Sequence, residues 1–204
     1  MHKQATAVGA TLPLQFSNEP IGSTVHLICA PLAASLVKWG GPWSDLLSAS
    51  RPSIVACFDG TSDYMVAEFV ITAPSIGAVP VLNELLDKLT HFGASACKVI
   101  DHDSLLTAWR IQHGEWMQFV DAAVFNATYA SRMDVLRATR HRSELLRMLA
   151  TRRLQTPFDR DNALAALLAT HNFSKPNQFL GGETPADVLM RSRTNALQAK
   201  EAEM

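Results

Sequence analysis

The chain has 204 residues, of which 48% are hydrophobic and 18% charged, and its formal net charge is −1. These values exclude an intrinsically disordered chain, which is poor in apolar residues and strongly charged, and the 10 glycines and 10 prolines exclude a collagen-like or low-complexity sequence. No apolar run reaches the roughly 18 residues of a membrane-spanning helix, and the first residues show no secretory signal. We therefore expect a cytoplasmic protein with no membrane partner.

The first half of the chain alternates between strand-like and helix-like patterns. Residues 1–22 are small and polar and predict an irregular arm. Compact β-branched runs predict strands over 24–30, 53–58, 64–72 and 94–100. A helix is expected after Pro31, and an amphipathic helix is expected over 79–92, ending at Gly93.

From Asp101 onward the sequence shows no strand pattern. Helical patterns cover 104–111, 115–129, 131–154 and 159–171. Thr184 and Pro185 begin a last helix, with threonine as the N-cap and proline at the first helical position. We expect the helix over 159–171 to be capped by Asp159 or Asp161.

Together these patterns predict an α/β N-terminal domain of order β-α-β-β-α-β, with about four strands, followed by an all-helical region. The predicted boundaries are an irregular arm over 1–22, the α/β domain over 23–112, the helical region over 113–195 and a frayed tail over 196–204. The sequence leaves the oligomeric state open.

The charges are unevenly distributed. Residues 1–130 carry 6 basic and 11 acidic side chains, whereas residues 131–204 carry 12 and 8. The arginine-rich helix over 131–154 includes Arg137, Arg140 and Arg147, which fall near one stripe. Such a helix could contact duplex DNA through its phosphates. It could equally pair with the acidic N-terminal part.

Three acidic side chains cluster around an expected hairpin: Asp59, Asp63 and Glu68. Paired carboxylates at strand positions can hold Mg²⁺ for phosphodiester cleavage. The predicted element order and the segment Val99–Arg110 resemble restriction-endonuclease-like proteins encoded by transposons, over about residues 53–130. That resemblance implies a Mg²⁺-dependent endonuclease, but Val70 stands where its lysine would be, so the nuclease would be degenerate.

Other catalytic signatures are missing from the sequence. Its seven histidines form no HxH, HxxxH or HExxH pattern, and its three cysteines form no CxxC pair. No GxSxG, GxGxxG or P-loop motif is present. Asp101-His102-Asp103 is consistent with a strand-to-helix turn capped by Asp103, or with part of a metal site. We expect no resident metal and no cofactor other than Mg²⁺ under the nuclease alternative.

The most specific local string runs from Asn177 to Leu189. It combines an apolar anchor, a glycine turn and a capped helix start, and the residues that we expect to contact a protein partner are Phe179, Leu180, Gly181, Gly182, Thr184, Pro185 and Leu189. Over about residues 159–195 it resembles the toxin-binding domain of bacterial antitoxins and the tail of integrase-type transposases. The antitoxin pattern would close with an apolar helix, whereas residues 191–204 are polar. The integrase resemblance implies a spaced carboxylate triad further back, and the sequence shows no such triad.

These observations favour a non-enzymatic bacterial regulatory or interaction protein, antitoxin-like or associated with a mobile element. Its partners would be duplex DNA, through the arginine-rich helix, and a protein, through the Gly-Gly/Thr-Pro helix start. The alternatives are the Mg²⁺-dependent endonuclease and a structural subunit of a larger complex.

Overall fold

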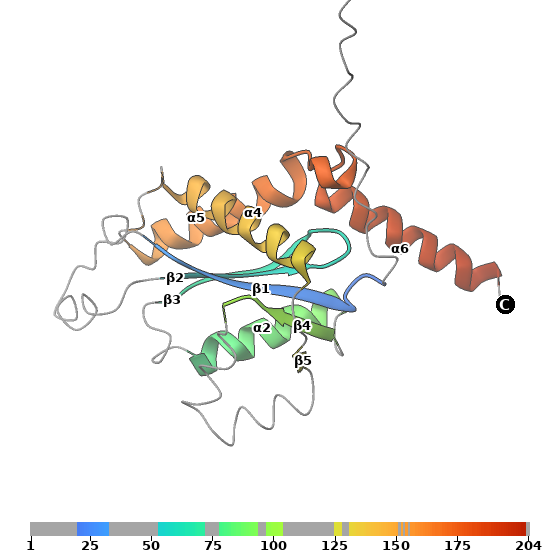
Figure 1. Cartoon of the computed structure of the whole chain (residues 1–204), viewed down its shortest axis with the longest axis horizontal. Helices are drawn as coiled ribbons and strands as arrows, with labels where there is room; N and C mark the ends of the chain where they lie inside the picture. The colour runs from blue at the N-terminus through green and yellow to red at the C-terminus, as the bar shows by residue number, and fades with distance from the viewer. Residues whose placement is uncertain are drawn as a thin grey trace, which may run out of the picture.

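The computed structural model describes residues 20–32, 53–71, 78–93, 97–103, 125–127, 131–150, 152, 154 and 156–202. Residues 1–19 of the arm predicted over 1–22, and the helices expected after Pro31 and over 104–111, lie outside these residues. In chain order the elements are β1 Thr24–Pro31, β2 Ser53–Asp59, β3 Met65–Ile71, α2 Ala78–Phe92, β4 Cys97–Asp101, β5 Phe125–Ala127, α4 Arg132–Leu149, α5 Pro157–Ala169, the π-helical turn η2 Thr170–Ser174, the 3₁₀ turn η3 Gln178–Leu180 and α6 Pro185–Ala202 (Figure 1).

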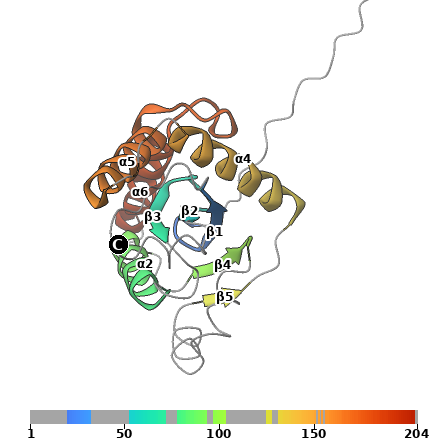
Figure 2. The same cartoon turned by 90° about the vertical axis from the view of Figure 1, so that its left-hand side faces the viewer.

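The strands form one five-stranded mixed sheet of order β3-β2-β1-β4-β5. β1, β2 and β3 pair antiparallel, whereas β4 and β5 run parallel to β1. Helices α4 and α5 lie over one face of the sheet and α2 lies on the other (Figures 1 and 2). The mixture of helices and strands that the sequence predicted is therefore confirmed.

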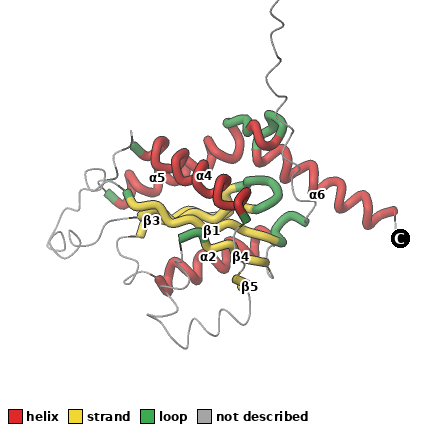
Figure 3. Tube along the Cα trace, in the orientation of Figure 1, coloured by secondary structure: helices red, strands yellow, loops and turns green. Residues whose placement is uncertain are grey.

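The short strand β5 corrects the prediction of an all-helical region after residue 112. The sequence predicted a helix over 115–129, but Phe125–Ala127 pairs with β4 in parallel, from Cys97↔Phe125 to Val99↔Ala127. Three residues are too few to show the alternation by which strands are found in a sequence. Figure 3 shows β5 at the edge of the sheet, beyond β4.

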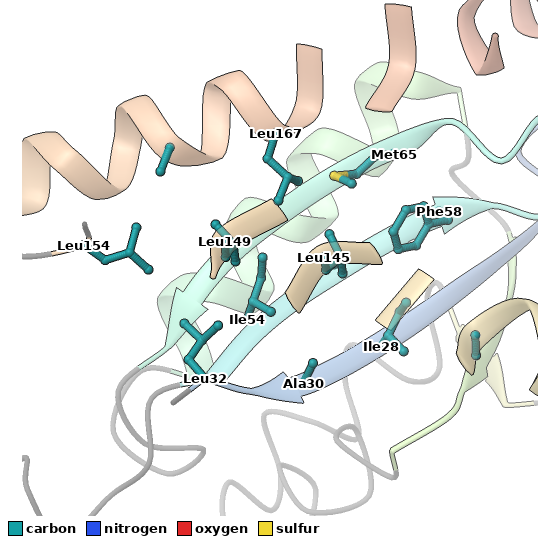
Figure 4. Close-up of a cluster of buried hydrophobic side chains, with 13 residues drawn as sticks. Ile28, Ala30, Leu32, Ile54, Phe58, Met65, Leu145, Leu149, Leu154 and Leu167 are labelled. Atoms are coloured by element: carbon teal, nitrogen blue, oxygen red, sulfur yellow. The ribbon is translucent and has the colours of Figure 1, made fainter. Parts of the chain in front are cut away.

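One hydrophobic core joins the two predicted parts of the chain. Side chains from β1, β2, β3, α4 and α5 form it (Figure 4), and its larger buried members are Ile28, Leu32, Ile54, Phe58, Met65, Leu145, Leu149, Leu154 and Leu167. Fully burying one such side chain stabilises the fold by about 1.5–3 kcal/mol. Because α4 and α5 bury their apolar faces on the strands, the sheet and these two helices stabilise one another.

Capping residues fix where the helices begin. Ser131 caps α4 in a capping box with Asp134, and Thr156 caps α5 in a capping box with Asp159. The cap of α5 is therefore Thr156, and Asp159 is its reciprocal partner. The predicted start of α6 is confirmed, since the Asp187 N–H donates to the Thr184 hydroxyl 3.2 Å away.

Helix α6 differs from its prediction at the other end. It continues as a helix to Ala202, through residues that the sequence predicted to fray, and it extends past the body of the molecule (Figure 1). No helix among the described residues is both long and apolar enough to span a membrane.

Candidate functional site

Two histidines and an aspartate meet where β1, the carboxyl end of β4 and the first turn of α4 come together. His26 lies on β1 and pairs with Ile100 of β4. Because β4 ends at Asp101, His102 is the next residue after the strand. The Nδ1 atom of His26 lies 3.0 Å from Nε2 of His102, and the two rings stack with 12° between their planes. The Nε2 atom of His26 lies 3.8 Å from Oδ1 of Asp134. We call this group the imidazole site.

The surroundings of the imidazole site keep its histidines neutral. Burial, reinforced by the positive charge of Arg137, lowers the pKa of His26 to about 3, against the pull of Asp134. Burial also lowers the pKa of His102. For Asp134, burial acts to raise the pKa, but hydrogen bonds with Ser131 and the neighbouring charges hold it below its usual value. The site therefore contains an ionised carboxylate beside two uncharged imidazoles.

This arrangement is poorly suited to holding Mg²⁺, although ligands of open α/β sheets bind outside the carboxyl ends of parallel strands. Mg²⁺ takes oxygen ligands, whereas the imidazole site offers mainly nitrogen donors. Asp103, beside His102, is already engaged by the Cys29 N–H and the Arg142 guanidinium.

A second polar group lies beneath α4 and is centred on the fully buried side chain of Asp63. Its carboxylate is 3.3 Å from both Nε of Arg137 and Nε2 of His141, 3.9 Å from a guanidinium nitrogen of Arg140, and accepts a hydrogen bond from the Asn177 amide at 2.8 Å. We call these five residues the Asp63 cluster. It ties the β2–β3 turn to α4 and to the C-terminal loop.

Charge and backbone geometry both single out Asp63. Burial alone would raise the pKa of its carboxyl, but the hydrogen bond with His141 and the positive charge of Arg137 hold that pKa well below its usual range. Asp63 is also the one non-glycine residue with a positive φ (57°) among the described residues. Aspartate and asparagine tolerate this left-handed conformation better than most residues.

The Asp63 cluster separates the three arginines that the sequence placed on one stripe. The side chains of Arg137 and Arg140 are only 22% and 27% exposed and are paired with Asp63, and the Arg140 guanidinium also lies 4.4 Å from the centre of the Phe179 ring. Arg147 is exposed. The sequence left two alternatives for these arginines, contact with DNA or pairing with the acidic N-terminal part. In this structure Arg137 and Arg140 pair with Asp63 of that part.

The carboxylates proposed for Mg²⁺ face different partners. Asp59 accepts hydrogen bonds from the Gly22 N–H at 2.8 Å and from the Ser62 N–H and hydroxyl at 2.7 and 2.6 Å. Asp63 faces α4, and Glu68 lies on β3 near the charges of Lys88 and Glu84. Among the described residues, Asp59, Asp63 and Glu68 do not form a group with ligand atoms within 4.8 Å of one another. The three carboxylates are close in sequence, but their side chains do not converge on a common position for an ion.

The burial of Glu68 makes the stability of the protein depend on pH. Burial raises the pKa of Glu68 to about 7, so the folded protein holds its proton up to higher pH than the unfolded chain does. The stability that comes from the protonated group is present below the unfolded pKa and is lost as pH rises through about 7. We expect Glu68→Gln to stabilise the protein at pH 8 by about 1 kcal/mol after allowing for solvent screening, and to change little at pH 5. Urea unfolding at the two pH values measures this difference, and equal effects at both would contradict it.

The C-terminal string is mostly an internal anchor. Leu180, Pro185 and Leu189 are buried, and Gly181 and Gly182 take positive φ angles of 67° and 92° in the turn before α6. Phe179 remains 38% exposed. Phe179 and the glycine turn are therefore the exposed part of the string, while its buried apolar residues pack α6 against the body.

Sequence reasoning missed several residues of these groups. Asn172 bonds both the N–H and the carbonyl of Met65 on β3, at 2.8 and 3.0 Å. His141, Glu144 and His171 are all buried, and no spacing motif for histidines covers them because they come from α4 and η2. The pair His141 and Glu144, three residues apart on one helix face, was the signal available in the sequence.

The fold is similar to that of retroviral integrases, including a catalytic core domain. The catalytic core domain of bovine immunodeficiency virus (BIV) integrase superposes with a TM-score of 0.53 and 14% identity, covering 86% of this chain and 99% of that one. An intasome of simian T-cell lymphotropic virus, in complex with the PP2A regulatory subunit B56 gamma, superposes with a TM-score of 0.52 and 12% identity, covering 83% of this chain and 55% of that one. No family model and no curated protein sequence matches the chain. The likeness agrees with the C-terminal resemblance to integrase-type transposases, and neither structure is an antitoxin.

Proposed function

We propose that this chain is a DNA-associated protein of a mobile genetic element, which uses the integrase-core fold to bind duplex DNA without Mg²⁺-dependent cleavage. The fold, shared with two retroviral integrases, supports the association with DNA. The observation that carries the second part is the imidazole site, where two neutral histidines lie beside the carboxyl end of β4. These histidines offer nitrogen atoms, whereas Mg²⁺ prefers oxygen ligands.

The exposed side of α4 supports a DNA-contacting surface. Arg132 and Arg147 are exposed, and because they are 15 residues apart they lie about 60° apart around the helix and about 22 Å apart along it. Arginines contact phosphates without reading sequence, and each neutralised phosphate adds to the salt dependence of binding. Arg137 and Arg140, which pair inward, would contribute to folding instead.

The test is a gel-shift titration of a labelled duplex at two salt concentrations, with and without Mg²⁺, so that binding and cleavage are resolved together. We expect the double variant Arg132→Ala/Arg147→Ala to bind about tenfold more weakly and to lower the salt slope by about 2. The matched control is Arg191→Ala/Lys200→Ala, which removes two exposed positive charges from α6 and should leave binding unchanged.

Two results would change this proposal. If the α4 variant and its control bind DNA equally well, the contact surface does not lie on α4. If the wild-type chain cuts the duplex only when Mg²⁺ is present, and Asp63→Ala abolishes cutting in a folded protein, the endonuclease alternative holds. A complex with a protein partner that is lost on Phe179→Ala would support the interaction role of the exposed end of the C-terminal string.

A further inference from the structure

Three buried side chains converge between α4 and η2. His141 and Glu144 lie one turn apart on α4, and His171 comes from η2; they are 1%, 7% and 4% exposed. Each can offer one ligand atom such that all three atoms lie within 4.8 Å of one another, and this is the one such group of histidine, cysteine or carboxylate side chains among the described residues. The Nδ1 atom of His171 is 3.6 Å from Oε1 of Glu144.

Asp63 fixes which nitrogen of each ring carries the proton. The Nε2 atom of His171 lies 2.9 Å from the backbone carbonyl of Asp63, which only accepts, so this nitrogen must be the donor. The Nε2 atom of His141 lies 3.3 Å from the ionised Asp63 carboxylate, which also accepts. In a neutral ring the other nitrogen then carries a lone pair. Both Nδ1 atoms are therefore acceptors.

The consequence is a buried group of acceptors that needs a cation. The Nδ1 atom of His141 has no hydrogen-bond partner among the described residues, and the Glu144 carboxylate lies between His171 and Lys175. The Lys175 ammonium, 2.6 Å from Oε1 of Glu144, supplies a positive charge from the rim, where its side chain is 39% exposed. A buried acceptor without a hydrogen-bond partner lowers the stability of the fold. A cation bound to the lone pair of His141 would remove this cost.

We propose that His141, Glu144 and His171 bind a divalent transition-metal ion, Zn²⁺ by preference, and that Lys175 takes its place when the metal is absent. Two imidazole nitrogens and one carboxylate oxygen form a ligand set that suits Zn²⁺, with bonds of about 2.0–2.2 Å. Mg²⁺ and Ca²⁺ prefer oxygen ligands. Asp63 holds the outer nitrogen of both rings, as carboxylates and carbonyls do for the histidines of metal sites.

The surroundings indicate a buried site with Lys175 at its rim. The pocket beside it is lined by Arg140, Glu144, His171, Lys175, Pro176, Asn177 and Pro185, and it leaves no room for a water molecule. The ion must therefore displace the Lys175 ammonium toward solvent, and Arg137 and Arg140 remain paired with Asp63. A bound ion would fasten α4 to η2 and so to the segment that leads into α6.

The experiment uses the full chain after dialysis against EDTA. Zn²⁺ is titrated in competition with a chromophoric chelator, and Co²⁺ is titrated separately to record its visible absorption. We expect one equivalent to bind, with Co²⁺ visible absorption bands that appear in step with binding. His171→Ala and Glu144→Gln should each weaken binding at least tenfold, whereas Lys175→Met should strengthen it because the competing charge is gone. His91→Ala, which removes an exposed histidine on α2, is the matched control and should bind as the wild type does.

The outcomes are separable from those of the DNA experiment, because the readout needs no nucleic acid. If wild type, His171→Ala and His91→Ala bind Zn²⁺ equally, the ion lies elsewhere and the proposal is overturned. It is equally overturned if the wild-type chain, folded by circular dichroism, binds none. If His171→Ala fails to fold, Lys175→Met still decides the matter: a variant that binds Zn²⁺ no more tightly than the wild type contradicts displacement of the ammonium.

Discussion

Replacing Asp63 by asparagine is expected to lower the free energy of unfolding by about 3–5 kcal/mol, the usual cost of removing one partner from a buried ion pair. The carboxylate has no exposed surface and is held by two guanidinium groups, one imidazole and one amide. Asparagine keeps the shape and tolerates the φ of 57°, so the change isolates the charge. Arg137 and Arg140 would then be left largely buried without their counter-ion.

The measurement is urea unfolding at pH 7, with Glu183→Gln as the control. Glu183 pairs with Arg191 at the surface, where the two side chains are 38% and 56% exposed, and such pairs contribute less than about 1 kcal/mol. A loss for Asp63→Asn no larger than that of the control would show that the Asp63 cluster does not stabilise the fold. The size of the stability loss also bears on the proposed function, because a carboxylate that holds the hairpin to α4 is not free to hold Mg²⁺.

The elements that could be predicted from the sequence are those whose pattern is local. The strands predicted over 24–30 and 53–58 match β1 and β2 to within one residue at their ends, and the helix predicted over 79–92 matches α2. In each case an unbroken β-branched run or an amphipathic stripe suffices, since it depends on neighbours in sequence.

The sheet order depends on contacts between distant parts of the chain and could not be predicted in the same way. β5 gains its partner from β4, more than twenty residues earlier, and contributes three residues. The sequence predicted two parts, but the structure has one core that joins them. The apolar stripe of α4, which includes Leu145 and Leu149, does not show in the sequence that it packs on β1 and β2.

The candidate sites were hidden because their residues also have ordinary local roles. Asp134 completes the capping box of α4, and His102 lies in the turn after β4, so neither signals its position beside His26. The arginine stripe was visible, but a helical wheel gives the direction of a side chain and not its partner. Only the fold shows that Asp63 faces Arg137 and Arg140 while Arg147 faces solvent.

The neutral state of His26 makes stability depend on pH in a direction that the structure fixes. The pKa of His26 is about 3 in the folded protein and about 6.5 in the unfolded chain. Between these two values the unfolded chain binds a proton at His26 and the folded protein does not. Stability from the neutral ring is therefore present above the unfolded pKa and is lost as pH falls. His102 and His141, whose pKa values are also lowered, act in the same direction.

We expect the stability of the wild type, relative to His26→Gln, to fall by about 2 kcal/mol between pH 7.5 and pH 5, because glutamine does not titrate and one pKa unit corresponds to about 1.4 kcal/mol. Urea unfolding of both proteins at several pH values measures this gap, and His91→Gln, an exposed histidine of α2, is the matched control to compare with it. A gap that stays constant would show that His26 has the same pKa in the folded protein as in the unfolded chain, so that burial does not hold the ring neutral. A wild type that instead gains stability relative to His26→Gln as pH falls would show that the fold favours the protonated ring. The imidazole site would then take up a positive charge beside Asp134 as pH falls, in place of the neutral ring stacked on His102.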